Sequence, residues 1–172
     1  MRRRLAVALV GLCLSGALAG AAGAQPAGSA SAPGRLDGPG VRAALATLGY
    51  PAREVRNEAG VEYEIVLRLR TGAAVTTRVT LSKDGSLVWL VAWLKKIPPG
   101  RTVSGNAVLD MLVENDAIGP THFSYNESRR WFFLNKPIVN QDLTADRLRA
   151  ELAGLGATVA RTENLWDPDH WR

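Results

Sequence analysis

The residue types that most often perform acid–base or metal chemistry are scarce in this chain. It has two histidines, His122 and His170, and one cysteine, Cys13. His122 has no Cys, Asp or Glu at a spacing that would complete a metal site, so it is expected to be a surface or partly packed histidine. His170 follows Asp167 and Asp169, but ligands on a terminal segment make a poorly preorganised cation site. The sequence therefore predicts neither a metal nor a cofactor.

Two glutamates, Glu62 and Glu64, share one face of a predicted strand, an arrangement that would suit the paired carboxylates of a glycosidase. They face Arg68, Arg70 and Arg78, so a solvated, charge-matched sheet surface is the simpler interpretation. The sequence contains no nucleophile elbow, phosphate-binding loop or dinucleotide fingerprint. No catalytic residue is predicted, and the chain is not expected to be an enzyme. A hydrolase is a less favoured alternative than a binding module or a ligand carrier.

Basic and aromatic side chains alternate at Arg129-Arg130-Trp131, which a single-stranded nucleic acid or another anionic ligand could use. A hairpin with a charged turn explains these residues more simply, and the Asn126–Ser128 sequon beside them indicates only a turn. The formal charge of +5 includes Arg2–Arg4, which belong to a segment expected to be removed. Without them, 18 basic residues face 16 acidic ones, which leaves +2. This near-neutral chain is not expected to bind nucleic acid.

The first 24 residues predict an export signal. Met1–Arg4 is basic, Leu5–Leu18 is uncharged and apolar, and Ala22–Ala24 offers the small residues that a signal peptidase requires before Gln25. Glycines within the apolar run make it a weak permanent membrane span. Cleavage would remove Cys13, so the mature chain would form no disulfide. The protein is therefore expected to be exported, periplasmic or extracellular, with no stable membrane span.

The remaining chain is expected to form one folded unit. Residues 25–35 are small, polar and proline-bearing, which predicts a flexible linker. Residues 36–166 are long enough for a single α+β domain with a real core. Residues 167–172 are expected to be a C-terminal tail.

Local patterns predict helix, three strands, helix, two strands, helix. Apolar residues at helical spacing follow Asp37, follow Thr102 or Ser104, and follow Thr144. The middle helix is expected to bury Val108, Met111 and Leu112. Strands are predicted at 61–69, 75–81, 87–94, 122–125 and 131–134, with an Asp-Gly turn at 83–86. An antiparallel sheet interrupted by helices in the order α-β-β-β-α-β-β-α is an α+β layer fold.

The third strand differs from the others because it is apolar on both faces. One face carries Leu87, Trp89, Val91 and Trp93. If every helix lies on the other side of the sheet, this row needs cover from a second subunit or a bound segment. Burying two tryptophans is worth several kcal/mol at roughly 25 cal/mol per Å². The alternative is that the C-terminal helix, or Trp166 and Trp171, covers the row within one chain.

The order of elements and three phrases resemble the type III secretion chaperone-like fold, including YbjN-like and CesT-like bacterial proteins. The phrases are AALATLGY at 43–50, LVENDAIGP at 112–120 with Phe123 soon after, and LTADRL at 143–148. The resemblance covers residues 36–166, nearly all of the mature chain. It implies the secretion chaperone-like α+β fold and a chaperone-like binding role, here in an exported variant.

The sequence thus predicts an exported, non-catalytic binding module. It would engage a protein partner, or itself as a homodimer, through the apolar row on the third strand. The alternative is a periplasmic carrier of a small ligand or lipid, in which the same row lines a cavity between sheet and helices. Small residues opposite the tryptophans would be needed, and Ala107, Ala150 and Ala157 are the candidates.

Overall fold

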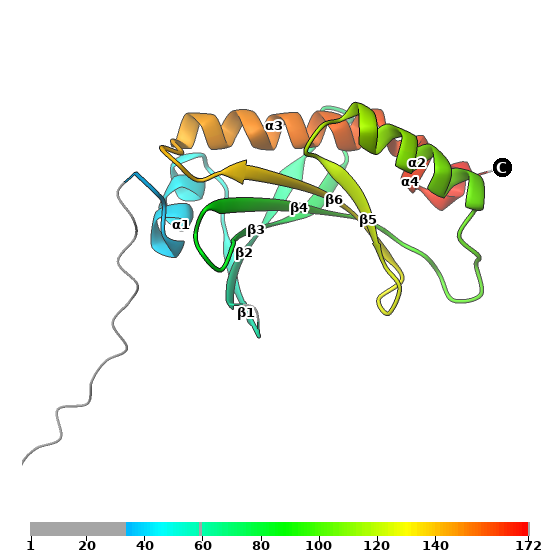
Figure 1. Cartoon of the computed structure of the whole chain (residues 1–172), viewed down its shortest axis with the longest axis horizontal. Coiled ribbons are helices and arrows are strands. Elements are labelled where there is room, and N and C mark those ends of the chain that lie inside the picture. Colours follow the sequence, from blue (N-terminus) through cyan, green and yellow to red (C-terminus); the bar gives the residue numbers. More distant parts are fainter. Residues whose placement is uncertain (1–33, 59, 172) are drawn as a thin grey trace, which may run out of the picture. The chain divides into compact units, whose positions relative to one another are not determined.

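A computed structural model of the chain describes residues 34–58 and 60–171 (Figure 1). The predicted export signal and linker residues 25–33 lie outside the described residues. In chain order the elements are α1 (Gly38–Thr47), β1 (Arg53–Asn57), β2 (Gly60–Arg68), β3 (Ala74–Leu81), β4 (Leu87–Lys96), α2 (Gly105–Ala117), β5 (His122–Asn126), β6 (Trp131–Val139), α3 (Ala145–Arg161), α4 (Glu163–Trp166) and the 3-10 helix η1 (Pro168–His170). None of the described helices is long and apolar enough to span a bilayer.

Capping residues set the starts of the three longer helices. The Asp37 carboxylate accepts a hydrogen bond from the Gly40 N–H at 2.8 Å, as expected for the first helix. Ser104 and Thr144 cap α2 and α3 in the same way. Gly49 ends α1 with a φ of +80°, a conformation that glycine adopts without strain. The three predicted helix starts are confirmed.

The six strands form one antiparallel sheet in the order β1-β2-β3-β4-β6-β5. The predicted α+β class and antiparallel sheet are confirmed, and the structure adds the edge strand β1. Its sequence REVRN has one apolar residue, Val55, among charged and polar ones. No alternation of apolar residues marks such a strand, because it is held by backbone pairing with β2 and not by burial.

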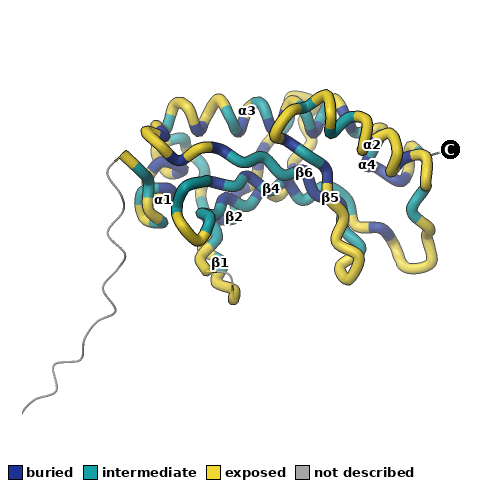
Figure 2. Tube along the Cα trace, in the orientation of Figure 1, coloured by how far each residue is buried: buried dark blue, intermediate teal, exposed yellow. Residues whose placement is uncertain are grey.

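The core lies between the sheet and α3, which runs along one sheet face (Figures 1 and 2). The predicted stripe of α3 is buried, and it meets the alternate side chains of four strands. The buried residues of this layer are Ile65, Leu67, Val79, Leu90, Ala92, Leu134, Leu148, Leu152, Leu155 and Val159. Because α1, α3 and the C-terminal helices gather over this face, the other face of the sheet is left without helical cover.

The orientation of α2 differs from the sequence prediction. Met111 is buried as expected, together with Ala107, but Val108 is 36% exposed and Leu112 is 58% exposed. The reason is that α2 lies beyond the main layer, in contact with β5 and α4 instead of the sheet centre. Only a narrow side of the helix is therefore covered.

The segment 167–172, predicted as a tail, packs on the domain as far as Trp171. The Asp167 carboxylate is buried and accepts a hydrogen bond from Lys95 Nζ at 3.1 Å. The Trp171 ring meets Phe132 edge-on at 5.9 Å, and its indole N–H donates to the Leu165 carbonyl at 2.7 Å. Phe132 belongs to the helix-covered face, so this packing closes the core and not the opposite face of the sheet.

Thr77→Val is expected to stabilise the protein by about 1 kcal/mol. Thr77 is fully buried on β3, and its hydroxyl has no hydrogen-bond partner among the described residues. Valine keeps the shape while removing a polar group that loses its water on folding. Urea unfolding of the two proteins would check this, and a loss of stability in the variant would contradict it.

The β3–β4 turn holds a carboxylate in its charged form. Asp84 Oδ1 accepts hydrogen bonds from the Ser82 hydroxyl at 2.6 Å, the Ser86 hydroxyl at 2.8 Å and the Ser86 N–H at 3.1 Å. These bonds, the one from Ser82 first, lower the pKa of Asp84 to about 2.

Asp84 is therefore expected to titrate near pH 2 in a carbon-13 NMR titration, and Ser82→Ala is expected to raise its pKa. Because the pKa is lowered in the folded state, the stabilisation is present above the ordinary Asp pKa of 3.8 and is lost as the pH falls toward 2. An Asp84 pKa at the ordinary value would contradict this network.

Candidate protein-binding surface

The strand register places the predicted row of β4 on the sheet face that the helices leave uncovered. Its members, Leu87, Trp89, Val91 and Trp93, are each half-buried. The alternate residues Val88, Leu90 and Ala92 are fully buried in the core. Strand pairing sets Val139, Pro137 and Phe133 of β6 opposite Leu87, Trp89 and Trp93. We call this surface the open sheet face; its apolar residues are Leu87, Trp89, Val91, Trp93, Trp131, Phe133, Pro137 and Val139.

One end of the open sheet face is a packed aromatic cluster. The Trp93 ring meets Trp131 at 5.3 Å and Phe133 at 5.1 Å between centroids, both edge-on. The guanidinium carbon of Arg78 lies 4.3 Å from the Trp93 centroid, and that of Arg129 lies 5.7 Å away. Edge-on ring pairs and cation–π contacts both stabilise such clusters. Trp93 is thus largely covered by its own neighbours.

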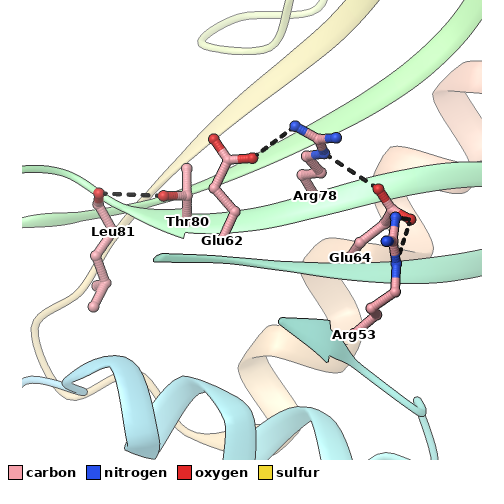
Figure 3. A network of polar contacts seen from close by, with 6 residues as sticks. All are labelled: Arg53, Glu62, Glu64, Arg78, Thr80 and Leu81. Atoms are coloured by element: carbon pink, nitrogen blue, oxygen red, sulfur yellow. Dashed lines mark hydrogen bonds and ion pairs between the residues drawn. The ribbon is translucent and has the colours of Figure 1, made fainter. Parts of the chain in front are cut away.

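A network of ion pairs holds Arg78 in this position (Figure 3). Arg78 Nη1 lies 2.8 Å from Glu62 Oε2, and its Nε lies 3.4 Å from Glu64 Oε2. Arg53 Nη2 lies 2.6 Å from the other oxygen of Glu64. The hydrogen bond from Arg53, with that from Arg78, holds the pKa of Glu64 below its ordinary value. The charge-matched interpretation of the two glutamates is confirmed for Arg78. Their second partner is Arg53, and neither Arg68 nor Arg70 pairs with them among the described residues.

The other end of the open sheet face is apolar and more accessible. Val139 is 55% exposed, beside Leu87. Within the described part of the chain, the one aromatic ring packed on Trp89 is His122, edge-on at 6.3 Å. Its Nδ1 lies 3.2 Å from the Pro120 carbonyl oxygen. The predicted row therefore has a covered end at Trp93 and an accessible end at Leu87 and Trp89.

The C-terminal acids do not gather a cation around His170. Asp169 is paired with Arg101 at 2.9 Å and Lys95 at 3.5 Å, and these cations lower its pKa. Across residues 34–58 and 60–171, no group of three or more His, Cys, Asp or Glu side chains could hold a metal ion.

The cavity postulated for a carrier is not formed by the residues named for it. Ala150 and Ala157 are exposed on the outer side of α3, and Ala107 is buried on α2. The tryptophan row lies on the opposite face of the sheet from α3, so these alanines do not stand across a space from it.

A second apolar surface, which was not predicted from the sequence, lies on α2. Leu109, Leu112 and Val113 are 61%, 58% and 73% exposed. Beside them, Met111, Phe123 and Phe132 help to line an apolar hollow of about 230 Å³. The signal was present in the segment AVLDMLV at 107–113, which holds more apolar residues than one buried stripe can take. We call Val108, Leu109, Leu112 and Val113 the α2 patch.

No protein-family model and no curated protein sequence matches this chain. Among solved structures, a chain of the ExsC–ExsE complex has a TM-score of 0.52 and 18% identity, over 72% of this chain and 88% of that one. A chain of the HopA1–SchA chaperone–effector complex has a TM-score of 0.48 and 12% identity, over 69% of this chain and 86% of that one. At such identities, the likeness concerns the fold alone. The similarity in fold rests on the chain of the ExsC–ExsE complex. The predicted secretion chaperone-like α+β fold is confirmed.

Proposed function

We propose that this protein is an exported, non-catalytic binding module that engages a protein partner through the open sheet face, in a chaperone-like role. The observation that carries the proposal is the apolar row of β4 and β6 on a sheet face without helical cover. An accessible apolar surface of this kind is typical of interaction sites. The fold supports it as well, because the similar ExsC–ExsE chain was solved in a complex of two proteins.

The energetics favour contact at the accessible end of the face. Full burial of a large apolar side chain is worth about 1.5–3 kcal/mol. The accessible end is only partly buried at Leu87, Trp89 and Val139. A partner that covers these side chains therefore gains part of this burial free energy from each of them. Trp89 is also the residue type most enriched at binding hot spots.

Site-specific photo-crosslinking in cells that export the protein would test the proposal. A photoreactive amino acid at position 139 is expected to capture a defined protein species, because Val139 lies on the open sheet face. The same group at position 157, on the outer side of α3, is the matched control. Trp89→Ser is expected to abolish the capture at 139. Equal capture at positions 139 and 157 would overturn the proposal. Capture at position 139 that is unchanged by Trp89→Ser would also overturn it.

The export part of the proposal rests on the sequence of residues 1–24. The secreted or periplasmic protein is expected to begin at Gln25, which mass spectrometry of the purified mature chain would show. A product found in the cytoplasm with its first 24 residues retained would contradict export.

Self-association has two candidate surfaces, and the α2 patch is the more exposed. A homodimer through α2 would cover Leu109, Leu112 and Val113, whereas the sequence placed the dimer on the row of β4. Light scattering across a dilution series of the mature protein distinguishes them. If the protein dimerises through α2, Leu112→Glu is expected to give monomers and Trp89→Ser is expected to leave the dimer intact. The reverse pattern would place the dimer on the open sheet face.

A further inference from the structure

We infer that the segment bound by the open sheet face is acidic as well as apolar, with carboxylates that meet a basic rim at the Trp93 end. This inference rests on the proposed function and adds the chemistry of the partner. The basic rim consists of Arg68, Lys96 and Arg129.

The strand register of Arg68 and Lys96, and the β5–β6 turn that carries Arg129, bring these three cations to one end of the face. Arg68 lies opposite Ala74 and shares the face of Glu62 and Glu64 on β2. Lys96 lies opposite Trp131, which packs on Trp93. Lys96 and Arg129 both line a hollow of about 470 Å³ together with Trp93 and Trp131, and all three cations are exposed.

Within residues 34–58 and 60–171, the cations of the basic rim have no carboxylate to neutralise them. None of the three takes part in an ion pair within the described residues, although the nearby Lys95 does, with Asp167 and Asp169. The two glutamates of the face are already occupied by Arg53 and Arg78.

The imbalance of charge extends to the segments that meet at this end. Residues 68–76, 93–101 and 126–131 hold seven arginines and lysines, of which Lys95 and Arg101 pair with Asp167 and Asp169; five cations therefore remain against one acid, Glu127. Cations held beside a low-dielectric aromatic cluster create a positive local field. A binding segment with carboxylates at this end is attracted by this field, which speeds its association and favours it over segments without carboxylates.

The geometry favours a protein segment over a nucleic acid. Single-stranded nucleic acids bind by stacking bases on free aromatic faces. The Trp93 ring has Arg78 and Arg129 over it, and Trp131 packs against Trp93, so this cluster offers little free stacking surface. Beyond the basic rim, the face continues into Leu87 and Val139, which suit apolar side chains and not phosphates.

Selection of peptides from a displayed library of random 12-residue sequences would test the inference, with the mature protein as bait. The enriched peptides are expected to combine apolar residues with Asp and Glu. Lys96→Glu/Arg129→Glu is expected to weaken their binding about tenfold, because each exposed ion pair contributes modestly. Binding is also expected to weaken as salt is raised from 50 to 300 mM. Arg147→Glu/Arg149→Glu, which makes the same change of net charge on α3, across the sheet from the open sheet face, is expected to bind as the wild type does.

The outcomes separate the inference from the proposed function. Apolar peptides without acidic enrichment, lost on Trp89→Ser but kept by Lys96→Glu/Arg129→Glu, would overturn the inference and leave the proposed function standing. Peptides whose binding is unchanged by Trp89→Ser would overturn both the inference and the proposed function. A fluorescent dT20 oligonucleotide that binds the wild type and is lost on Lys96→Glu/Arg129→Glu would overturn the inference in favour of a nucleic acid. Circular dichroism and thermal unfolding of every variant control for loss of the fold.

Discussion

Asn140→Ala is expected to lower the free energy of unfolding by about 3 kcal/mol, because Asn140 joins three separate parts of the chain. Its side-chain amide is completely buried and donates to the Leu36 and Gly85 carbonyls, both at 2.8 Å. Its Oδ1 accepts from the Leu36 N–H at 3.2 Å. Alanine would leave these backbone groups without their partner at the junction of the N-terminal segment, the β3–β4 turn and the end of β6.

Urea unfolding of the mature protein measures this effect, with Asn135→Ala as the matched control. Asn135 also bridges strands, from its Nδ2 to the Ser124 hydroxyl at 2.8 Å, but it lies half-exposed on the open sheet face. Water can replace its hydrogen bonds, so the control is expected to cost less than 1 kcal/mol. Equal and small losses at both positions would show that the Asn140 network does not hold these segments together.

Local signals predicted most of the fold because they act within a few residues. The Asp37 cap, the alternation of β2 and β3 and the stripe of α3 are each complete in the sequence and are present in the structure. Asn140 shows the limit of such signals. It stands in a polar stretch after β6, and its partners lie up to 104 residues away, so nothing local marks it as buried.

Elements that depend on tertiary contacts were the ones mispredicted or missed. The helical spacing of apolar residues predicted α2 itself. Which side of α2 is buried depends on β5 and α4, which cover Ala107 and Met111. The segment after Trp166 is polar and short. It packs on the domain because Trp171 contacts Phe132, which lies far away in the sequence. Such contacts follow from the assembled sheet and not from the pattern of the segment itself.

The candidate site was predicted in part for the same reason. The row of β4 follows from alternation alone, and the structure places it on the open sheet face. Its division into a covered and an accessible end depends on cross-strand register, which sets Phe133 beside Trp93 and Pro137 beside Trp89. Alternation along the strand therefore does not distinguish Trp89 from Trp93, although their surroundings in the structure differ.

Trp93→Ala is expected to lower the free energy of unfolding by about 2–3 kcal/mol, whereas Trp89→Ala is expected to cost about 1 kcal/mol. Removal of the Trp93 ring leaves a gap between Trp131 and Phe133 and takes away the surface on which Arg78 rests. Trp89 has fewer aromatic contacts, with His122 at its edge. Urea unfolding of both variants tests this difference, and a larger loss for Trp89 would contradict it.

Trp93→Phe separates packing from polarity in the cluster. The indole N–H of Trp93 is buried and has no hydrogen-bond partner among the described residues. Phenylalanine removes this donor and keeps a ring beside Trp131, so it is expected to cost less than 1 kcal/mol. Partner capture at position 139 should then survive Trp93→Phe and fail with Trp89→Ala, although Trp93→Ala is the more destabilising of the two alanine variants. This contrast is expected because Trp93 is packed inside its aromatic cluster, whereas Trp89 lies at the accessible end of the open sheet face.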